Sequence, residues 1–236
     1  METEEPSLFE AVEEGKVEDV QKLINGGADV NQEHSGWTAL HIAAQEGHLE
    51  VVEILLENKA NINKQNKGAT PLYIASQEGH LEIVKSLLDH SAQVDSENNK
   101  ATPLLIAAQE GHYDVVKELL NRGANINHVD AGDSALQYAV TNNHLEVVKL
   151  LLDYKLDVNI KDNGDTAIML AAENSLSEIV TELVKAGALV SEKNNGKTAI
   201  ELTEREDIKQ LLQEKSKAKK KGFFAKCFSC GNAEKK

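Results

Sequence analysis

Two groups of residues in this chain have the types and spacing that chemistry requires. Histidines recur at even intervals, at His48, His80, His112 and His144. Evenly spaced imidazoles suggest metal binding. Near the C-terminus, Cys227 and Cys230 form a C-x-x-C pair, which is the spacing of zinc-binding and redox-active cysteines. A metal site or a redox site needs additional side chains close to these residues. Whether such a site can form therefore depends on the secondary-structure elements that carry them.

The histidines belong to a repeating unit. The spacing is 32 residues at every step when six hydroxyl residues are aligned, namely Thr38, Thr70, Thr102, Ser134, Thr166 and Thr198. The aligned blocks include TALHIAAQEGHLEVVEILL and TPLLIAAQEGHYDVVKELLNRGANIN, and a more polar copy occupies residues 7–31. One such unit cannot bury its apolar face alone, so the sequence predicts that the units stack.

Each unit is predicted to contain two helices. Thr is a good N-cap, and Pro71 and Pro103 follow it at the first helical position, where a missing N–H does no harm. Gly47 ends the first helix of the second unit, and an apolar stripe at i, i+3 and i+4 predicts a second helix from about His48 to Glu57. The first helix is expected to face the core with Leu40, Ile42, Ala43 and Ala44.

These blocks resemble ankyrin repeats over roughly residues 5–214. The resemblance implies an all-α solenoid of helix–turn–helix units joined by hairpin loops. The expected repeats lie at about 5–35, 36–67, 68–99, 100–131, 132–163 and 164–195, with a polar cap at 196–214 and a flexible tail at 215–236. In this family the histidine that opens the second helix is structural, and His41 at the Thr-x-x-His position is a hydrogen-bonded helix-start residue.

The chain also departs from the family pattern. The Gly expected near Lys59, Ser91 and Lys155 is absent. If those positions are left-handed, each costs up to about 1 kcal/mol relative to Gly. The Gly-His step becomes Asn143-His144 in the fifth unit and Ser175-Leu176 in the sixth, so these two units are expected to be less regular.

The repeat argues against the chemistry that the histidines and cysteines suggest. Packed helices lie about 8–10 Å apart, whereas zinc nitrogens must lie about 2.0–2.1 Å from one metal ion. A row of histidines at repeat spacing therefore cannot converge on an ion. The Cys pair supplies two ligands where structural zinc needs four, and it lacks the βαβ context of a redox motif. We expect no enzyme, no cofactor, no metal and no small-molecule substrate.

Charge is divided unevenly along the chain. Residues 215–236 carry eight Lys and one Glu, a net charge of +7. The net charge of the whole chain is −14, so residues 1–214 carry a net charge of −21. Such an acidic body argues against nucleic-acid binding, which depends on neutralising phosphates. The N-terminus METEEPSLFE has the features of neither a secretory signal nor a myristoylation site. We expect a monomer in the cytoplasm.

A protein-binding surface is the remaining candidate for function. In ankyrin-like arrays, partners contact the hairpin tips and the exposed end of each first helix. A row of glutamates in one register there favours a basic partner, although Gln-Glu is also a common solvated helix surface. Trp37 is the only Trp, at a position that the repeat does not need filled, and Trp is enriched in binding hot spots. The predicted contact residues are Trp37, Glu14, Gln45, Glu46, Gln77, Glu78, Gln109, Glu110 and Tyr154.

The C-terminal segment KSKAKKKGFFAKCFSC combines basic, aromatic and cysteine residues. Each Lys contributes about 1 kcal/mol near anionic lipid, Phe enters the interface, and Cys227 and Cys230 are candidate S-acylation sites. The predicted membrane-contact residues are Lys219, Lys220, Lys221, Phe223, Phe224 and Phe228. The alternatives are a nuclear-import patch, a calmodulin-type target, a plain solubilising tail, and docking on the row of glutamates at Glu14, Glu46, Glu78 and Glu110.

Two functions follow from the sequence. The first is a protein-interaction adaptor or scaffold, held by its tail at the inner face of a membrane. The alternative is a nuclear or cytoplasmic regulator that binds a transcription factor or another basic partner, with the tail as an import signal or a self-docking segment.

Overall fold

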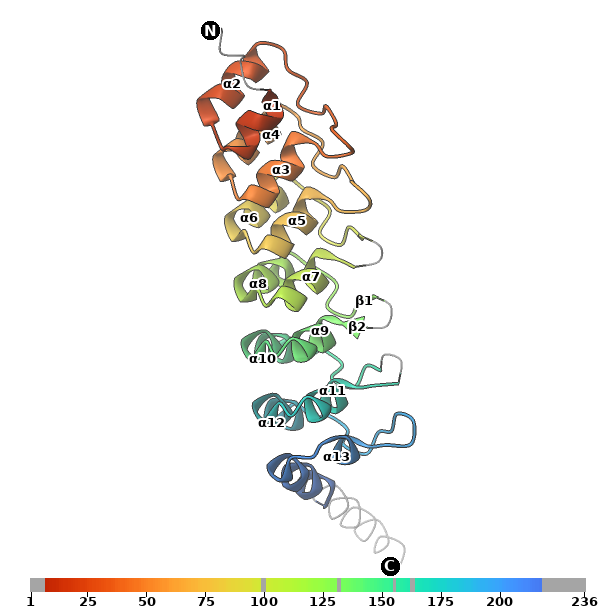
Figure 1. The fold of residues 1–236 in the computed structure, drawn as a ribbon. Coiled ribbons are helices and arrows are strands. Elements are labelled where there is room, and N and C mark those ends of the chain that lie inside the picture. The colour runs from red at the N-terminus through yellow and green to blue at the C-terminus, as the bar shows by residue number, and fades with distance from the viewer. Residues whose placement is uncertain (1–6, 99–100, 131–132, 155, 162–163, 218–236) are drawn as a thin grey trace, which may run out of the picture. The chain divides into compact units, whose positions relative to one another are not determined.

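The computed structural model describes residues 7–98, 101–130, 133–154, 156–161 and 164–217. The chain divides into two compact units, Met1–Ala131 and Gly132–Lys236. Paired short helices alternate with hairpin loops in each unit (Figure 1). The mostly helical repeat fold that the sequence predicts is thereby confirmed.

The first unit contains two layers of helices. The first helices of the repeats pack side by side in one layer, the second helices form the other, and the hairpins extend from the first layer (Figure 1). The first-helix layer consists of α1 (Leu8–Glu13), α3 (Ala39–Glu46), α5 (Pro71–Glu78) and α7 (Pro103–Glu110). The second-helix layer consists of α2 (Val17–Asn25), α4 (Leu49–Glu57), α6 (Leu81–Asp89) and α8 (Tyr113–Asn121), and β1 (Val129–Asp130) follows α8.

Local capping chemistry fixes the ends of the first helices, as the sequence predicts. The Thr70 hydroxyl accepts a hydrogen bond from the Tyr73 amide at 3.2 Å, and Pro71 occupies the first turn. At the other end, Gly47 and Gly79 close α3 and α5 in the left-handed conformation, with φ of 80° and 78°. Glycine adopts this conformation without the steric cost that other residues bear.

The recurring histidines join each repeat to the one before it. The Nε2 atoms of His48, His80 and His112 lie 3.1, 2.9 and 2.8 Å from the carbonyl oxygens of Glu13, Gln45 and Gln77, respectively. A carbonyl oxygen only accepts, so each imidazole donates through Nε2–H. Each of these histidines also immediately precedes a second helix. The structural role that the family resemblance implies for them is therefore observed.

A second row of hydrogen bonds joins the loops that follow the second helices. Side-chain oxygens accept from backbone amides 30 residues further along the chain. Three residue pairs of the first unit form such bonds, namely Asn61 N with Asn31 Oδ1 at 2.7 Å, Gln93 N with Asn63 Oδ1 at 2.9 Å, and Asn125 N with Asp95 Oδ1 at 3.0 Å. Each repeat junction in this unit is thus held by bonds at both ends of the second helix.

The core of the first unit confirms the predicted apolar pattern with one exception. Leu40, Ala43 and Ala44 are buried, but Ile42 is only half-buried. At the same register in the next two repeats, Ile74 and Ile106 are buried in a cluster with Tyr73. The repeat before Ile42 carries the exposed Glu10 in that register, so Ile42 lacks the apolar neighbour that its successors have.

The second unit continues the same architecture with less regular helices. It consists of β2 (Asp133–Ser134), α9 (Ala135–Thr141), α10 (Leu145–Asp153), α11 (Ala167–Glu173), α12 (Ser177–Lys185) and α13 (Ala199–Leu202). The first helices α9 and α11 have 7 residues each, against 8 in α3. Asn143 and Ser175 occupy the left-handed position with φ of 60° and 61°. The irregularity that the sequence predicts for these repeats is therefore present.

A last helical segment closes the second unit at residues 206–217. Lys215 donates from Nζ to the carbonyl oxygen of Val184 at 3.0 Å. Residues 215–217, which the sequence predicts to belong to the tail, thus extend the final helix, and Lys215 contacts the repeat before it. No helix in the described ranges combines the length and apolar character that crossing a bilayer requires.

Candidate protein-binding site

Four glutamates occupy the C-terminal ends of the first helices in the first unit. Glu14 follows α1, and the last residues of α3, α5 and α7 are Glu46, Glu78 and Glu110. All four are exposed. We refer to them as the acidic row. The structure therefore places the predicted set at equivalent ends of neighbouring helices.

The acidic row retains most of its negative charge. Lys16 forms an ion pair with Glu14, and this hydrogen bond raises the pKa of Lys16. Glu46 accepts a hydrogen bond from the Gln45 amide at 3.1 Å, which leaves its charge in place. In the part of the chain that the structure describes, no ion pair neutralises Glu46, Glu78 or Glu110. A cationic partner would therefore meet unpaired carboxylates.

The predicted glutamines serve two purposes. Gln45 and Gln77 use their backbone carbonyls to accept from the histidines of the next repeat, while their side chains are exposed. Gln109 is half-buried and donates to Glu110 at 3.0 Å. The side chains of Gln45 and Gln77 are thus more exposed to a partner than that of Gln109.

Trp37 is held in a defined position at the base of a hairpin. Its backbone exchanges two hydrogen bonds with His34, at 2.8 and 3.0 Å. Its ring lies edge-on to the His41 ring with 5.7 Å between centroids, and it packs against the buried cluster of Tyr73, Ile74 and Ile106. The expectation that the fold does not need this side chain is therefore wrong in part. Trp37 supports the core with one side and remains half-exposed.

His41 has a structural role at the start of α3. It is fully buried, its Nε2 donates to the carbonyl oxygens of Lys64 at 3.0 Å and Ala69 at 3.3 Å, and its Nδ1 accepts from the Thr38 amide at 3.2 Å. Burial lowers the pKa of His41. The neutral imidazole thus fixes the helix start and the following hairpin, as the family resemblance implies.

A groove of about 620 Å³ lies between the first repeat and the first hairpin. Three half-buried apolar side chains line it, namely Phe9 from α1, Trp37 from the hairpin and Ile42 from α3. The exposed carboxylates of Glu10, Glu13 and Glu46 also line it. We call this feature the N-terminal groove, its apolar residues the floor and its glutamates the rim.

The groove is built from rigidly placed groups. The Phe9 ring lies 5.9 Å from the His34 ring, centroid to centroid. Glu10 accepts a hydrogen bond from the Ser7 amide at 2.7 Å, and this bond, followed by one from the Ser7 hydroxyl, lowers the pKa of Glu10. Glu10 is thereby charged and fixed at the start of α1.

Sequence reasoning did not find the N-terminal groove, although a signal was present. Phe9 is the one Phe outside residues 223–228, and it occupies the register of the buried His41. Glu10 stands where the next repeats have isoleucine. Phe9 is thus followed by a glutamate where later repeats have an apolar residue. This combination indicates an apolar surface in the first repeat that remains partly exposed.

The remaining predicted site residues belong to the second unit or lie outside the described ranges. Tyr154 follows α10 in the second unit and is 39% exposed. The predicted lipidation sites Cys227 and Cys230 lie outside the described residues, as do the membrane-contact residues Lys219, Lys220, Lys221, Phe223, Phe224 and Phe228. Among the residues that are described, no group of three or more His, Cys, Asp or Glu is placed to hold a metal ion.

Comparison with known proteins identifies the repeat. A family model for ankyrin repeats in three copies matches residues 8–98 and 93–162, and a second ankyrin repeat model matches residues 142–184. No curated protein sequence matches the chain significantly.

Solved structures of ankyrin repeat domains resemble the chain along most of its length. The ankyrin repeat domain of human ASB11 is 31% identical, with a TM-score of 0.83, over 89% of this chain and 97% of that one. The ankyrin repeat domain of Bcl-3, described as a unique member of the IkappaB protein family, is 29% identical. Its TM-score is 0.80, over 90% of this chain and 100% of that one.

Proposed function

Because this chain belongs to the ankyrin repeat family, we propose that it is an adaptor that binds a basic protein through the acidic row and the adjoining hairpins. Ankyrin repeat domains generally act as protein–protein interaction modules and are typically not enzymes. The observation that carries the proposal is the set of exposed, unneutralised carboxylates at Glu46, Glu78 and Glu110.

Charge complementarity of this kind acts mainly on the rate of association and on partner choice. Clustered carboxylates raise the local concentration of a cationic surface and discourage acidic partners. Salt screens such an attraction, because the Debye length is only about 8 Å at physiological ionic strength. The partner should therefore bind more slowly as salt is added.

The test is affinity capture from cell extract with the full chain, followed by quantification of each captured protein. The variant is Glu78→Gln with Glu110→Gln. The matched control is Glu50→Gln with Glu53→Gln, which makes the same charge change on exposed residues of the second helix α4. A genuine partner is retained by the control and depleted several-fold by the acidic-row variant. Equal capture by both variants would contradict a role for the acidic row.

The adaptor is further proposed to reside at the cytoplasmic face of a membrane through residues 215–236. This part rests on the composition of the segment, in which Lys219, Lys220 and Lys221 precede three Phe and the pair Cys227 and Cys230. A basic cluster and an acyl chain together provide the two signals that durable anchoring requires.

Cell fractionation tests the anchor. The full chain is compared with Cys227→Ser, Cys230→Ser, and with wild type treated with hydroxylamine, which cleaves thioesters. Release of the protein from membranes by both interventions would support acylation. Wild-type protein in the soluble fraction would remove the anchor from the proposal and leave the acidic row unaffected.

A second candidate is a nuclear regulator that binds a basic partner such as a transcription factor, with KAKKK as the import signal. The cluster of Lys at residues 217–221 is the observation that favours it. The same fractionation separates the two, because this candidate requires soluble, nuclear protein whose location changes when Lys219, Lys220 and Lys221 are replaced by Gln.

A further inference from the structure

We infer that the N-terminal groove binds a bulky apolar side chain, flanked by Lys or Arg, from a short segment of a separate partner protein. The inference rests on the proposed function and specifies the partner's chemistry at one place on the first unit. Its basis is the juxtaposition of an apolar floor of Phe9, Trp37 and Ile42 with a rim of Glu10, Glu13 and Glu46.

The floor selects an apolar group. Phe9, Trp37 and Ile42 remain half-buried, whereas Ile74 and Ile106, the counterparts of Ile42, are buried in a cluster with Tyr73. Apolar surface at this register is thus covered in two repeats and left accessible in one. A partner side chain that covers it gains free energy in proportion to the apolar area removed from water. At about 620 Å³, the groove has room for an aromatic or large aliphatic side chain and its neighbours.

The rim selects a cation beside that side chain. Among the residues that line the groove, three are Glu and none is Lys or Arg. Glu10 is held by the Ser7 amide at 2.7 Å, and Glu46 by the Gln45 amide at 3.1 Å, so both carboxylates are positioned before a ligand arrives. Carboxylates next to an apolar cavity favour Lys or Arg and disfavour anionic ligands.

The residues that border the groove are held in place by contacts of their own, which lowers the cost of binding a short segment. Trp37 is fixed by two backbone hydrogen bonds with His34 and by its edge contact with His41. A preorganised site avoids the entropic cost of ordering its own side chains when it binds. Aromatic anchors in such pockets contribute most of the binding free energy in many interfaces.

The test uses fluorescence anisotropy with a labelled peptide of sequence KKGFFAK, which joins Lys and Phe as the rim and floor require and equals residues 220–226 of this chain. The host is the full chain with Phe223, Phe224 and Phe228 replaced by Ala, so that its own tail lacks aromatic side chains. Two altered peptides, KKGAAAK and EEGFFAE, separate the apolar contribution from the charge contribution.

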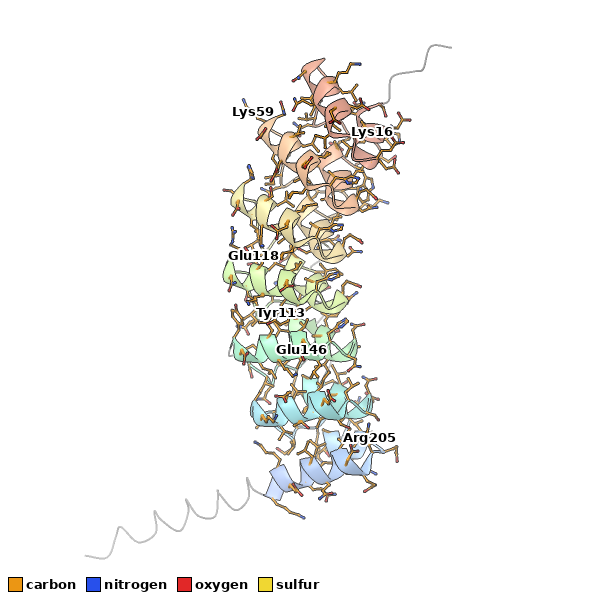
Figure 2. All side chains as sticks on the ribbon, turned by 90° about the vertical axis from the view of Figure 1, so that its left-hand side faces the viewer. Lys16, Lys59, Tyr113, Glu118, Glu146 and Arg205 are labelled. Atoms are coloured by element: carbon orange, nitrogen blue, oxygen red, sulfur yellow. The ribbon has the colours of Figure 1, made fainter. Side chains whose placement is uncertain are left out.

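The groove variants are chosen so that they are expected to fold, either because other repeats carry the same residue or because the helix cap is retained. Trp37→Ala installs the residue found at the same register in the next two repeats, Ala69 and Ala101. Glu13→Gln, combined with Glu46→Gln, removes two rim charges and leaves Glu10 in its helix cap. The controls are Tyr113→Ala, which removes an aromatic ring from the second-helix face (Figure 2), and Glu50→Gln with Glu53→Gln.

The expected result is a loss of affinity of at least tenfold for Trp37→Ala and several-fold for the rim variant, with both controls within twofold of the parent. KKGAAAK and EEGFFAE should each bind at least tenfold more weakly than KKGFFAK. Unlabelled KKGFFAK should also change the emission of Trp37, the single Trp, in a saturable manner. Equal binding by the groove variants and their controls would overturn the inference.

The chain's own tail is the competing occupant. If the host with substituted Phe binds the peptide at least tenfold more tightly than wild type does, the tail occupies the groove and the assignment to a separate partner is wrong. Equal affinities support a groove available to a separate partner. Captured proteins that are depleted by Glu78→Gln, Glu110→Gln but retained by Trp37→Ala would leave the proposed function standing and reject the groove.

Discussion

A Cβ atom placed on Gly47 would lie 2.8 Å from Cε1 of His80, the histidine that opens the second helix of the next repeat. The same relationship holds between Gly15 and His48, where the corresponding distance is 2.7 Å. Glycine is therefore required at Gly47 for two reasons, its φ of 80° and the imidazole that covers it. The fifth repeat has Asn143 at the register of Gly47, and the sixth repeat, which follows it, has Leu176 at the register of His80. Asparagine thus replaces glycine where no histidine covers the position.

A double-mutant cycle on Gly47 and His80 should therefore show coupling. Gly47→Asn alone should destabilise by more than about 1 kcal/mol, because it adds a steric clash to left-handed strain. His80→Leu alone should cost about 1 kcal/mol through the lost bond to Gln45 O. The double variant should be more stable than the sum of the two effects implies. Urea unfolding measures all three, and strict additivity would contradict the steric account.

Ser76→Ala should stabilise the protein by about 1 kcal/mol. Within the residues that the structure describes, the Ser76 hydroxyl is buried and has no hydrogen-bond partner. A buried unsatisfied polar group costs about 1–3 kcal/mol. Ala44 and Ala108 occupy the same register. Thermal unfolding of the full chain provides the measurement. Ser96→Ala is the control and should destabilise, because the Ser96 hydroxyl bonds to that of Thr70 at 3.0 Å.

Lys59→Gly and Ser91→Gly should each stabilise by up to about 1 kcal/mol. Both residues are left-handed, with φ of 65° and 68°, a conformation that glycine adopts at less cost. The control is Gly123→Ala, whose added Cβ would meet nothing within 4 Å although φ is 88°. It should destabilise through backbone strain alone. Denaturant titration measures the free energy of unfolding of all three variants. A loss of stability in Lys59→Gly or Ser91→Gly would contradict the assumption that the left-handed backbone is strained at these positions.

His41→Gln should flatten the dependence of stability on pH. Burial lowers the folded-state pKa of His41 below the unfolded value of about 6.5. The unfolded chain therefore binds more protons between these two values, and stability is lost as the pH falls below about 6.5. Glutamine is a suitable replacement because Gln137 makes the equivalent bonds, accepting from the Ser134 amide at 3.0 Å and donating to the Asp165 carbonyl at 3.3 Å.

Melting temperatures at pH 7.5 and pH 5.5 test this expectation. The decrease between the two should be larger for wild type than for His41→Gln. An equal decrease in both proteins would mean that His41 does not contribute to the acid sensitivity of the fold.

Much of the fold could be predicted because its determinants are local and repeat in register. The N-cap residues Thr70 and Thr102, each followed by Pro, mark helix starts without reference to tertiary structure. The left-handed positions Lys59 and Ser91 follow from comparison with glycines in sister repeats. Such features need only the alignment of one repeat with another.

The candidate site was less predictable because it depends on contacts between unlike residues. The row of glutamates follows from register, but the groove depends on how Phe9 and Trp37 from different repeats leave Ile42 partly uncovered. Repeat alignment treats each position separately and does not report such an arrangement. It also gives no indication that Trp37 packs against the cluster of Tyr73, Ile74 and Ile106.

The bonds between repeats in the first unit connect equivalent positions at a constant offset. His80 binds the carbonyl of Gln45, and His112 binds that of Gln77, both 35 residues earlier. Removing residues 68–99 as one block would place His112 over Gly47 and next to the Gln45 carbonyl, so the junction would be re-formed with the same partners. A gene encoding such a chain can therefore gain or lose whole repeats by recombination, whereas an insertion or deletion of a few residues changes the offset at the junction that it interrupts. The length of the binding surface can therefore change while the hydrogen bonds between neighbouring repeats stay the same.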